Sequence, residues 1–293
     1  MPVPDSRVRC AVVRVQGVRR PHTKPFLVSL DPNSLKKKRA MLKSAKYAIL
    51  RTHGGLGNQL FQVLFGRLFA EQHGLVLREL HDHRYRHAFS RSTEIARSAA
   101  PSAWQKLISS LRIPKVMTRL VGRSEAPWRL GRSIYLDGYF QIAEDYGSFP
   151  EDVIRRHLRV LAGELAIEPA DLQICLVHLR TGDFFSDRAA AKAHVIQRLA
   201  TAPAGSHVMT NDEALLNEPE VAEVMEARGV KMITTQGFSA EQVLRTMARY
   251  QRIDANDSKL TFWSSVLANC NVQLRHPRLR ACRDLLARYG SGL

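Results

Sequence analysis

The chain has 293 residues, of which 45% are hydrophobic and 24% are charged, a composition ordinary for a globular protein that buries a core. Its formal net charge is +17, but residues 1–46 hold 12 Lys and Arg residues against two acidic ones, so the rest is only mildly basic. That balance suits an anionic ligand or surface and does not require nucleic acid. No apolar run approaches the roughly 20 residues of a membrane helix, and the start is not typical of a secretory signal.

The four cysteines, Cys10, Cys175, Cys270 and Cys282, show no Cys or His partner at a zinc-binding spacing. This pattern argues against a disulfide scaffold and indicates a reducing compartment. Cys175 lies inside an apolar run, so we expect it in the core. We therefore expect a cytoplasmic protein.

Residues 1–46 differ from the rest of the chain: they contain five prolines and a run of four basic residues at 36–39. We predict a mobile basic arm. Four explanations stay open for it: a surface tail without a fixed role, peripheral contact with anionic lipids on the cytoplasmic face of a membrane, an organellar transit peptide, or extra residues ahead of a true start at Met41.

The first regular segment is a predicted strand from Tyr47 to Thr52, followed by a glycine-rich turn at residues 54–59. Apolar residues at helical spacing then predict a helix over residues 60–73, which Gly74 ends. A second strand begins at Val76. This order is typical of a right-handed βαβ unit.

The glycine-rich turn is either a simple tight turn or a phosphate cradle. It departs from the dinucleotide fingerprint, because Leu60 stands where the third glycine is expected, and it lacks the Walker lysine. Asn58 and Gln59 both donate and accept hydrogen bonds, as sugar hydroxyls require.

Residues 81–135 carry no clear functional pattern. We expect a helix near residues 104–120, and we interpret His81, His83 and His87 as a solvated cluster, since no ligand lies at a matching metal spacing. A strand at 134–141 and helical structure from Ala143 lead to a linker near 162–171. We place a domain boundary there, between residues 47–165 and residues 166–293.

Strands and helices alternate in the second half, which predicts a parallel sheet. The expected strands are residues 174–179, 207–210, 231–235 and a short segment at 252–255. The expected helices are residues 189–199, 219–228, 239–247, where Ser239 and Gln242 form a capping box, and 257–267. The two halves predict two Rossmann-like, doubly wound domains that face a cleft.

Three loops follow strands of this second sheet, at residues 178–183, 211–213 and 257–261. In open α/β sheets, ligands bind outside the carboxyl ends of the strands. Arg180 carries the planar donor fork that suits a phosphate, although Arg180 and Asp183 could simply pair with each other. Together the loops supply the cations, carboxylates and hydroxyls that a nucleoside diphosphate needs.

Five segments resemble, in order, the motifs of the α-1,2-fucosyltransferases of glycosyltransferase family 11. Residues 54–62, GGLGNQLFQ, are similar to that family's GGLGNQMFQ, and residues 137–141 to its GYFQ segment. Residues 178–183 resemble HxRRGD, and residues 210–212 resemble SDD. Residues 257–265 resemble NSSFSWWAA less closely.

The resemblance implies a GT-B-like fold and an inverting enzyme that moves fucose from GDP-fucose to a galactoside hydroxyl, in surface polysaccharide or glycan synthesis, without a metal or other cofactor. The resemblance also implies roles for individual residues: Arg180 on the diphosphate, His178 on the nucleoside, Asp212 on guanine, Ser258 and Thr261 near the phosphates, and Gly55, Gly57, Asn58 and Gln59 along the acceptor side of the cleft. Lys259, between Ser258 and Thr261, is expected to bind the donor through its charge.

This sequence departs from the family's motifs at several positions. Thr181 replaces an Arg, Asp257 replaces an Asn and Phe262 replaces a Trp, while Lys259 adds a positive charge. Cleavage of the sugar–diphosphate bond builds oxocarbenium character on the sugar and negative charge on the leaving group. We expect Arg180 and Lys259 to stabilise that charge. Asp183 is either the base that deprotonates the acceptor or a residue that only orients Arg180.

Two other functions stay open. The weakened last motif would suit a nucleotide-sugar-binding or carbohydrate-binding protein without transfer activity. The basic arm would suit nucleic-acid binding that is steeply salt-dependent. The sequence leaves the identity of the acceptor open.

Overall fold

The computed structural model describes residues 45–81, 103–104, 107, 128–130, 132–181, 185, 187–255, 258–274 and 276–290. All of these belong to a compact unit that spans residues 41–293. Most of the expected arm, most of the helix expected near residues 104–120, and Asp183 and Asp257 lie outside the described residues. No helix within these ranges combines the length and the apolar character needed to cross a membrane.

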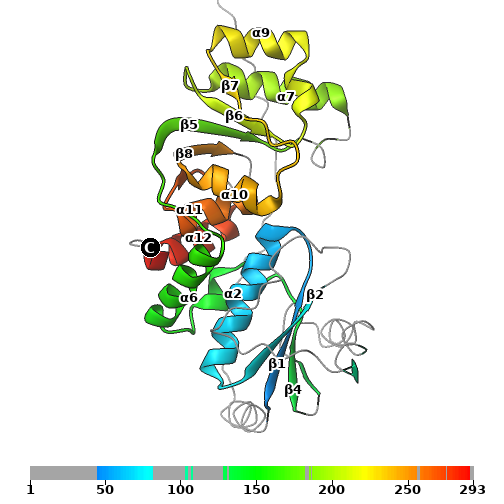
Figure 1. Ribbon diagram of the computed structural model, residues 1–293, viewed down its shortest axis with the longest axis vertical. Coiled ribbons are helices and arrows are strands. Elements are labelled where there is room, and N and C mark those ends of the chain that lie inside the picture. Colours follow the sequence, from blue (N-terminus) through cyan, green and yellow to red (C-terminus); the bar gives the residue numbers. More distant parts are fainter. Residues whose placement is uncertain are drawn as a thin grey trace, which may run out of the picture. The chain divides into compact units, whose positions relative to one another are not determined.

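The first sheet has the order β2-β1-β4-β3 (Figure 1). Its strands are β1 (Tyr47–Thr52), β2 (Val76–His81), β3 (Trp128–Leu130) and β4 (Ser133–Leu136). β1 pairs in parallel with both β2 and β4, as a βαβ unit requires, and β3 adds an antiparallel edge that the sequence did not reveal. β4 ends at Leu136, five residues earlier than expected, and Phe140, inside the expected strand, has a φ of 51°, outside the β region.

Helix α2 (Leu56–Gln72) packs along β1. It begins four residues earlier than expected: Gly55 is its N-cap with extended backbone, and Asn58 and Gln59 lie in its first turn. The expected start at Leu60 was wrong because two glycines close together were interpreted as loop. Gly74, with a φ of +61°, ends the helix region as predicted.

The second sheet is fully parallel and has the order β7-β6-β5-β8-β9. Its strands are β5 (Leu172–Leu179), β6 (His207–Thr210), β7 (Lys231–Met232), β8 (Tyr250–Ala255) and β9 (Asn271–Val272). Besides α2, the helices of the described residues are α5 (Ala143–Tyr146), α6 (Glu151–Glu164), α7 (Arg188–Thr201), α8 (Glu213–Leu216), α9 (Pro219–Ala227), α10 (Ala240–Ala248), α11 (Lys259–Leu267) and α12 (Pro277–Gly290). The α/β fold class expected from the sequence is therefore confirmed.

Several details of the second half differ from expectation. β7 is three residues shorter than predicted, and α8, β9 and α12 were not predicted. The capping box is confirmed: the Ser239 N–H donates to Gln242 Oε1 at 2.7 Å, and the Gln242 N–H donates to Ser239 Oγ at 3.2 Å. Cys175 is buried, as expected.

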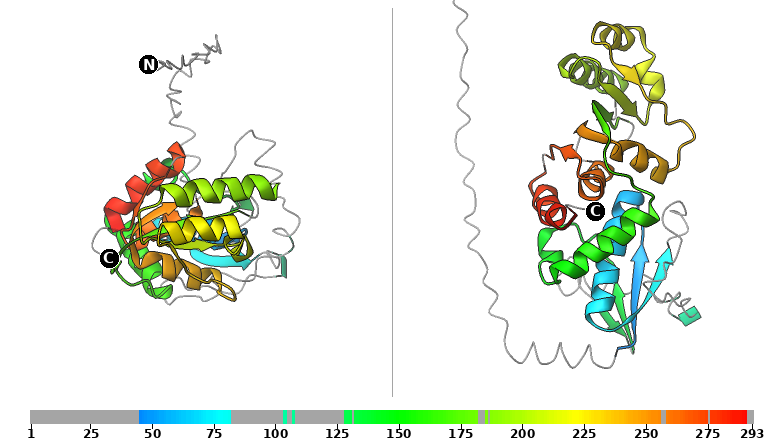
Figure 2. Two further views of the ribbon diagram at one scale, coloured as in Figure 1. Left: turned by 90° about the horizontal axis from the view of Figure 1, so that it is seen from above. Right: turned by 60° about the vertical axis from the view of Figure 1, so that its left-hand side comes forward.

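A large apolar cluster joins the two halves. It contains the buried face of β1, most of α2, and residues of α6, α10, α11 and α12. Phe61 of α2 meets the rings of Phe262 and Trp263 of α11 at centroid distances of 4.6 and 4.8 Å. Helix α12 lies against α6 (Figure 2). α11 and α12 thus pack on helices of the first half, although they follow strands of the second.

Candidate functional site

The carboxyl edge of the second sheet brings three of the predicted motifs together. β5 lies between β6 and β8, and His178 is in register with Met209 on one side and Ala255 on the other. The loops that follow these strands therefore start at neighbouring points of one edge. This adjacency follows from the strand order, which the sequence alone did not provide.

His178 lies inside β5, which confirms the strand expected at 174–179, so the loop expected from residue 178 begins beyond Leu179. Its side chain is 8% exposed, and its Nδ1 has no hydrogen-bond partner among the described residues. Burial, with a smaller contribution from the positive charge of Arg180, lowers the pKa of His178 to about 4. The imidazole is therefore neutral near pH 7.

The residues just beyond β5 are tied to the loop that follows β6. Arg180 is half-buried, and Thr181 is buried. The backbone N–H and the hydroxyl of Thr181 donate to Oδ1 of Asn211 at 3.0 and 3.4 Å. Asn211 therefore fixes the backbone next to Arg180, a role that the motif comparison did not assign to it.

Asp212 is the N-cap of α8. Its Oδ1 accepts a hydrogen bond from the N–H of Leu215 at 3.3 Å, and its Oδ2 lies 3.6 Å from the guanidinium of Arg188. These contacts engage both carboxylate oxygens within the protein. The guanine contact expected for Asp212 stays a prediction.

The start of α11 uses its hydroxyl side chains internally. Ser258 is the N-cap and accepts from the N–H of Leu260 at 3.3 Å, while Thr261 Oγ1 donates to the carbonyl of Ser258 at 2.7 Å. Both residues are buried, and Lys259 is half-buried. Among these three expected phosphate ligands, Lys259 has the side chain with the most solvent access.

The glycine-rich turn of the first half lies directly against this helix start. The indole Nε1 of Trp263 donates to the carbonyl of Gly57 at 2.8 Å. A Cβ atom on Gly57 would lie 2.6 Å from Cβ of Lys259, a contact that real Cβ atoms do not make. Two predicted motifs, whose residues Gly57 and Trp263 are 206 positions apart in sequence, are therefore in van der Waals contact.

Within the glycine-rich turn, the two amide side chains have different surroundings. Gln59 is buried, and its Nε2 donates to the carbonyl of Gly54 at 2.7 Å, which stabilises the turn itself. Asn58 is half-buried, and its Oδ1 accepts from Gln141 Nε2 at 2.8 Å. Gly55, the N-cap, is exposed, and a Cβ atom added to it would meet no described atom within 4 Å.

Sequence reasoning missed two aromatic rings beside this turn. The rings of His53 and Tyr139 are in tilted contact at a centroid distance of 4.8 Å, and Tyr139 is 41% exposed. The available signal was their position: His53 directly precedes the glycine pair, and Tyr139 is the aromatic residue at the centre of the 137–141 motif.

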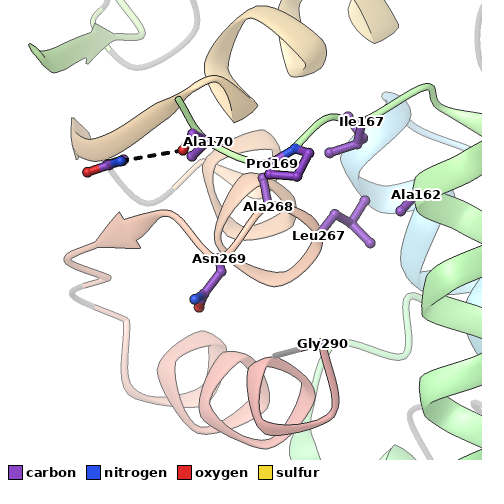
Figure 3. A pocket seen from close by; sticks show the side chains of 9 residues that line it. Ala162, Ile167, Pro169, Ala170, Leu267, Ala268, Asn269 and Gly290 are labelled. Carbon is purple, nitrogen blue, oxygen red and sulfur yellow. Dashed lines mark hydrogen bonds between the residues drawn. The ribbon is translucent and has the colours of Figure 1, made fainter. Parts of the chain in front are cut away.

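A cavity of about 510 Å³ lies elsewhere, near the amino end of β5 (Figure 3). Gln251 Nε2 donates to the carbonyl of Ala170 at 3.5 Å at its margin. The cavity is lined by Ala162, Ile167, Pro169, Ala170, Gln251, Leu267, Ala268, Asn269 and Gly290, none of which is a predicted site residue. Within the described ranges, no group of three or more His, Cys, Asp or Glu side chains could hold a metal ion.

No family model and no curated protein matches this chain. Among solved structures, it is similar to NodZ α-1,6-fucosyltransferase co-crystallised with GDP, at 15% identity and a TM-score of 0.44, over 76% of this chain and 93% of that one. It is also similar to fucosyltransferase NodZ from Bradyrhizobium, at 16% identity and a TM-score of 0.43, over 76% and 92% of the two chains. A family 9 glycosyl transferase from Veillonella parvula matches at 13% identity and a TM-score of 0.38, over 82% and 84%. Similarity at this level says nothing about substrate.

Proposed function

We propose that this chain is an inverting glycosyltransferase of GT-B-like fold that moves fucose from GDP-fucose to a hydroxyl of a galactose-containing glycan. The observation that carries the proposal is the contact between the glycine-rich turn at Gly57 and the start of α11 at Lys259. Two of the five motifs on which the fucosyltransferase resemblance depends are thereby adjacent in space, which supports the proposal that they belong to one site.

In this proposal the donor binds at the carboxyl edge of the second sheet. Arg180 would contact the diphosphate, and Lys259 with the N-terminus of α11 would add positive charge beside it. His178, which is neutral near pH 7, would hydrogen-bond the nucleoside without adding charge. Asp212 would accept from guanine through Oδ2, which lies 3.6 Å from Arg188, while Oδ1 keeps its bond to the N–H of Leu215.

The proposed chemistry is an inverting displacement at the anomeric carbon. The bond from that carbon to the diphosphate oxygen breaks while an acceptor hydroxyl oxygen attacks from the opposite face, and GDP leaves with the electron pair. Arg180 and Lys259 would stabilise the negative charge that develops on the leaving group. Asp183 would take the proton of the acceptor hydroxyl, and the alternative that it only orients Arg180 stays open.

Donor binding tests the proposal most directly. We expect GDP-fucose and GDP to raise the melting temperature of the full chain, and UDP-sugars at the same concentration to leave it unchanged, since a ligand that binds only the folded state stabilises it. GDP-mannose tests whether the protein distinguishes fucose from another sugar on the same nucleotide. Absence of any effect from guanine nucleotides would contradict the proposed donor.

A second function is favoured by one observation: the side chains of Asp212, Ser258 and Thr261 are all engaged in local capping or helix contacts. A chain that had lost part of its donor site would keep such contacts and bind a nucleotide sugar without transferring it. GDP binding without detectable fucose transfer to any galactoside would favour this alternative.

A further inference from the structure

The carboxyl edge of the first sheet carries a second group of polar and aromatic side chains. β1 and β4 are neighbours and parallel, with Leu50 in register with Leu136, so the chain beyond both strands begins at one edge. The segment after β1 leads into the glycine-rich turn, and the segment after β4 is the 137–142 loop. Two pairs of side chains connect them.

The 137–142 loop is anchored through Phe140. Its ring is buried and stacks on Phe65 at 3.9 Å with an interplanar angle of 4°, and its carbonyl accepts from the hydroxyl of Tyr146 at 2.8 Å. Phe140 has a φ of 51°, a conformation unusual for an aromatic residue, which such surroundings must hold in place. The residues on either side, Tyr139 and Gln141, instead meet the segment after β1.

The first pair is Tyr139 with His53. Tyr139 is 41% exposed, and its ring contacts that of His53 at a centroid distance of 4.8 Å and an interplanar angle of 45°. Gln62, which is buried, accepts from the backbone N–H of His53 at 2.9 Å, so its amide nitrogen faces His53 Nδ1 at 3.2 Å. Because the Gln62 amide nitrogen donates to Nδ1, Nδ1 accepts, and the proton of the neutral His53 ring is assigned to Nε2. The ring that supports Tyr139 is thereby fixed in orientation and tautomer.

The second pair is formed by amides. Gln141 Nε2 donates to Asn58 Oδ1 at 2.8 Å, and both side chains are half-buried. This bond uses one oxygen and one nitrogen, so the pair still offers Asn58 Nδ2 as a donor and Gln141 Oε1 as an acceptor. A donor next to an acceptor suits neighbouring hydroxyl groups.

We propose that the exposed ring of Tyr139 and this amide pair bind a pyranose ring of the acceptor glycan. An aromatic face suits the C–H face of a pyranose, and the amides suit its hydroxyls. A phosphate would need cations, whereas Arg51 of β1 and Asp137, which follows β4, lie 3.8 Å apart and offset each other's charge. Asn58 directly follows Gly57, so the sugar is held beside the contact with α11. The assignment of this pyranose to the acceptor rests on the proposed function.

The test is saturation-transfer NMR on the full chain with methyl β-D-galactopyranoside and N-acetyllactosamine, each with and without GDP. We expect saturation of the sugar by the unchanged protein. The dissociation constant should be about tenfold larger in Tyr139→Ala and should change less than twofold in Tyr139→Phe, which keeps the ring. The matched control is Phe238→Ala, because Phe238 has the same 41% exposure on the loop before α10. Circular dichroism verifies that each variant is folded.

Equal sugar binding by the Tyr139→Ala variant and the unchanged protein, or no saturation of either sugar, would overturn the subsite. The donor measurement separates this outcome from failure of the proposed function. GDP-fucose stabilisation without a Tyr139-dependent sugar signal rejects the subsite alone. A Tyr139-dependent sugar signal without any guanine-nucleotide stabilisation supports the subsite and rejects the fucosyltransferase.

Discussion

The indole N–H of Trp263 donates to the carbonyl oxygen of Gly57 over 2.8 Å, joining α11 to the first turn of α2. Gly57 has no side chain at the point where these helices meet, and Lys259 occupies the space that a methyl group would need. The same contact holds the two halves of the proposed site together. We therefore expect substitutions at this contact to change the free energy of unfolding, which can be measured separately from the proposed activity.

Gly57→Ala should destabilise the protein. Its new Cβ would lie 2.6 Å from Lys259 Cβ and 2.9 Å from the Lys259 carbonyl carbon, so backbone must move. Overpacking of this kind costs about 1–3 kcal/mol. Urea denaturation measures the change, and Gly55→Ala is the matched control, since no atom of the described residues lies within 4 Å of its Cβ position. Similar losses in the two variants would show that the contact with α11 is not tight.

Trp263→Phe removes the indole N–H and keeps an aromatic ring. The buried Gly57 carbonyl then loses this partner, which should cost about 1–3 kcal/mol in the free energy of unfolding. Trp104→Phe, at a position that is 65% exposed, serves as the control and should change stability by less than about 0.5 kcal/mol. An unchanged stability in Trp263→Phe would mean that water replaces the hydrogen bond.

Arg180→Ala should lower kcat/KM for fucose transfer about 100-fold or more, the usual effect of removing one donor that stabilises developing charge. Arg249→Ala, which breaks only an exposed pair with Asp171, controls for the loss of one positive charge. A folded Arg180→Ala enzyme that loses less than about threefold would exclude Arg180 from the diphosphate site.

His178 should make stability depend on pH. Its pKa falls from 6.5 to about 4 on folding, so the unfolded chain binds the proton more readily. The contribution is complete above pH 6.5, is lost progressively as the pH falls toward 4, and amounts to about 3 kcal/mol when fully lost. Unfolding free energies at pH 7.5 and 4.5 should differ less in His178→Gln than in the unchanged protein. His276→Gln, at an exposed position, should keep the full difference.

The sequence predicted the elements whose patterns are local. Apolar runs located β1, β5 and β6, and the Ser239 capping box located α10. It placed the start of α2 too late because the backbone freedom of Gly55 and Gly57 suggests a loop, whereas Gly57 is needed for its small size. Nothing local signals the bond from Thr181 to Asn211 or from Trp263 to Gly57, because strand order and helix packing decide which loops meet.

Asn211→Ala tests whether the loop beyond β6 positions Arg180. Asn211 Oδ1 accepts from both the N–H and the hydroxyl of Thr181, so its loss should loosen the backbone next to Arg180. We expect KM for the donor to rise about tenfold, a loss near 1.4 kcal/mol, while kcat changes less, because an interaction that only positions the donor acts mainly on binding. Asn217→Ala, exposed at the end of α8, is the matched control. A fall in kcat with an unchanged KM would instead place Asn211 in the chemical step.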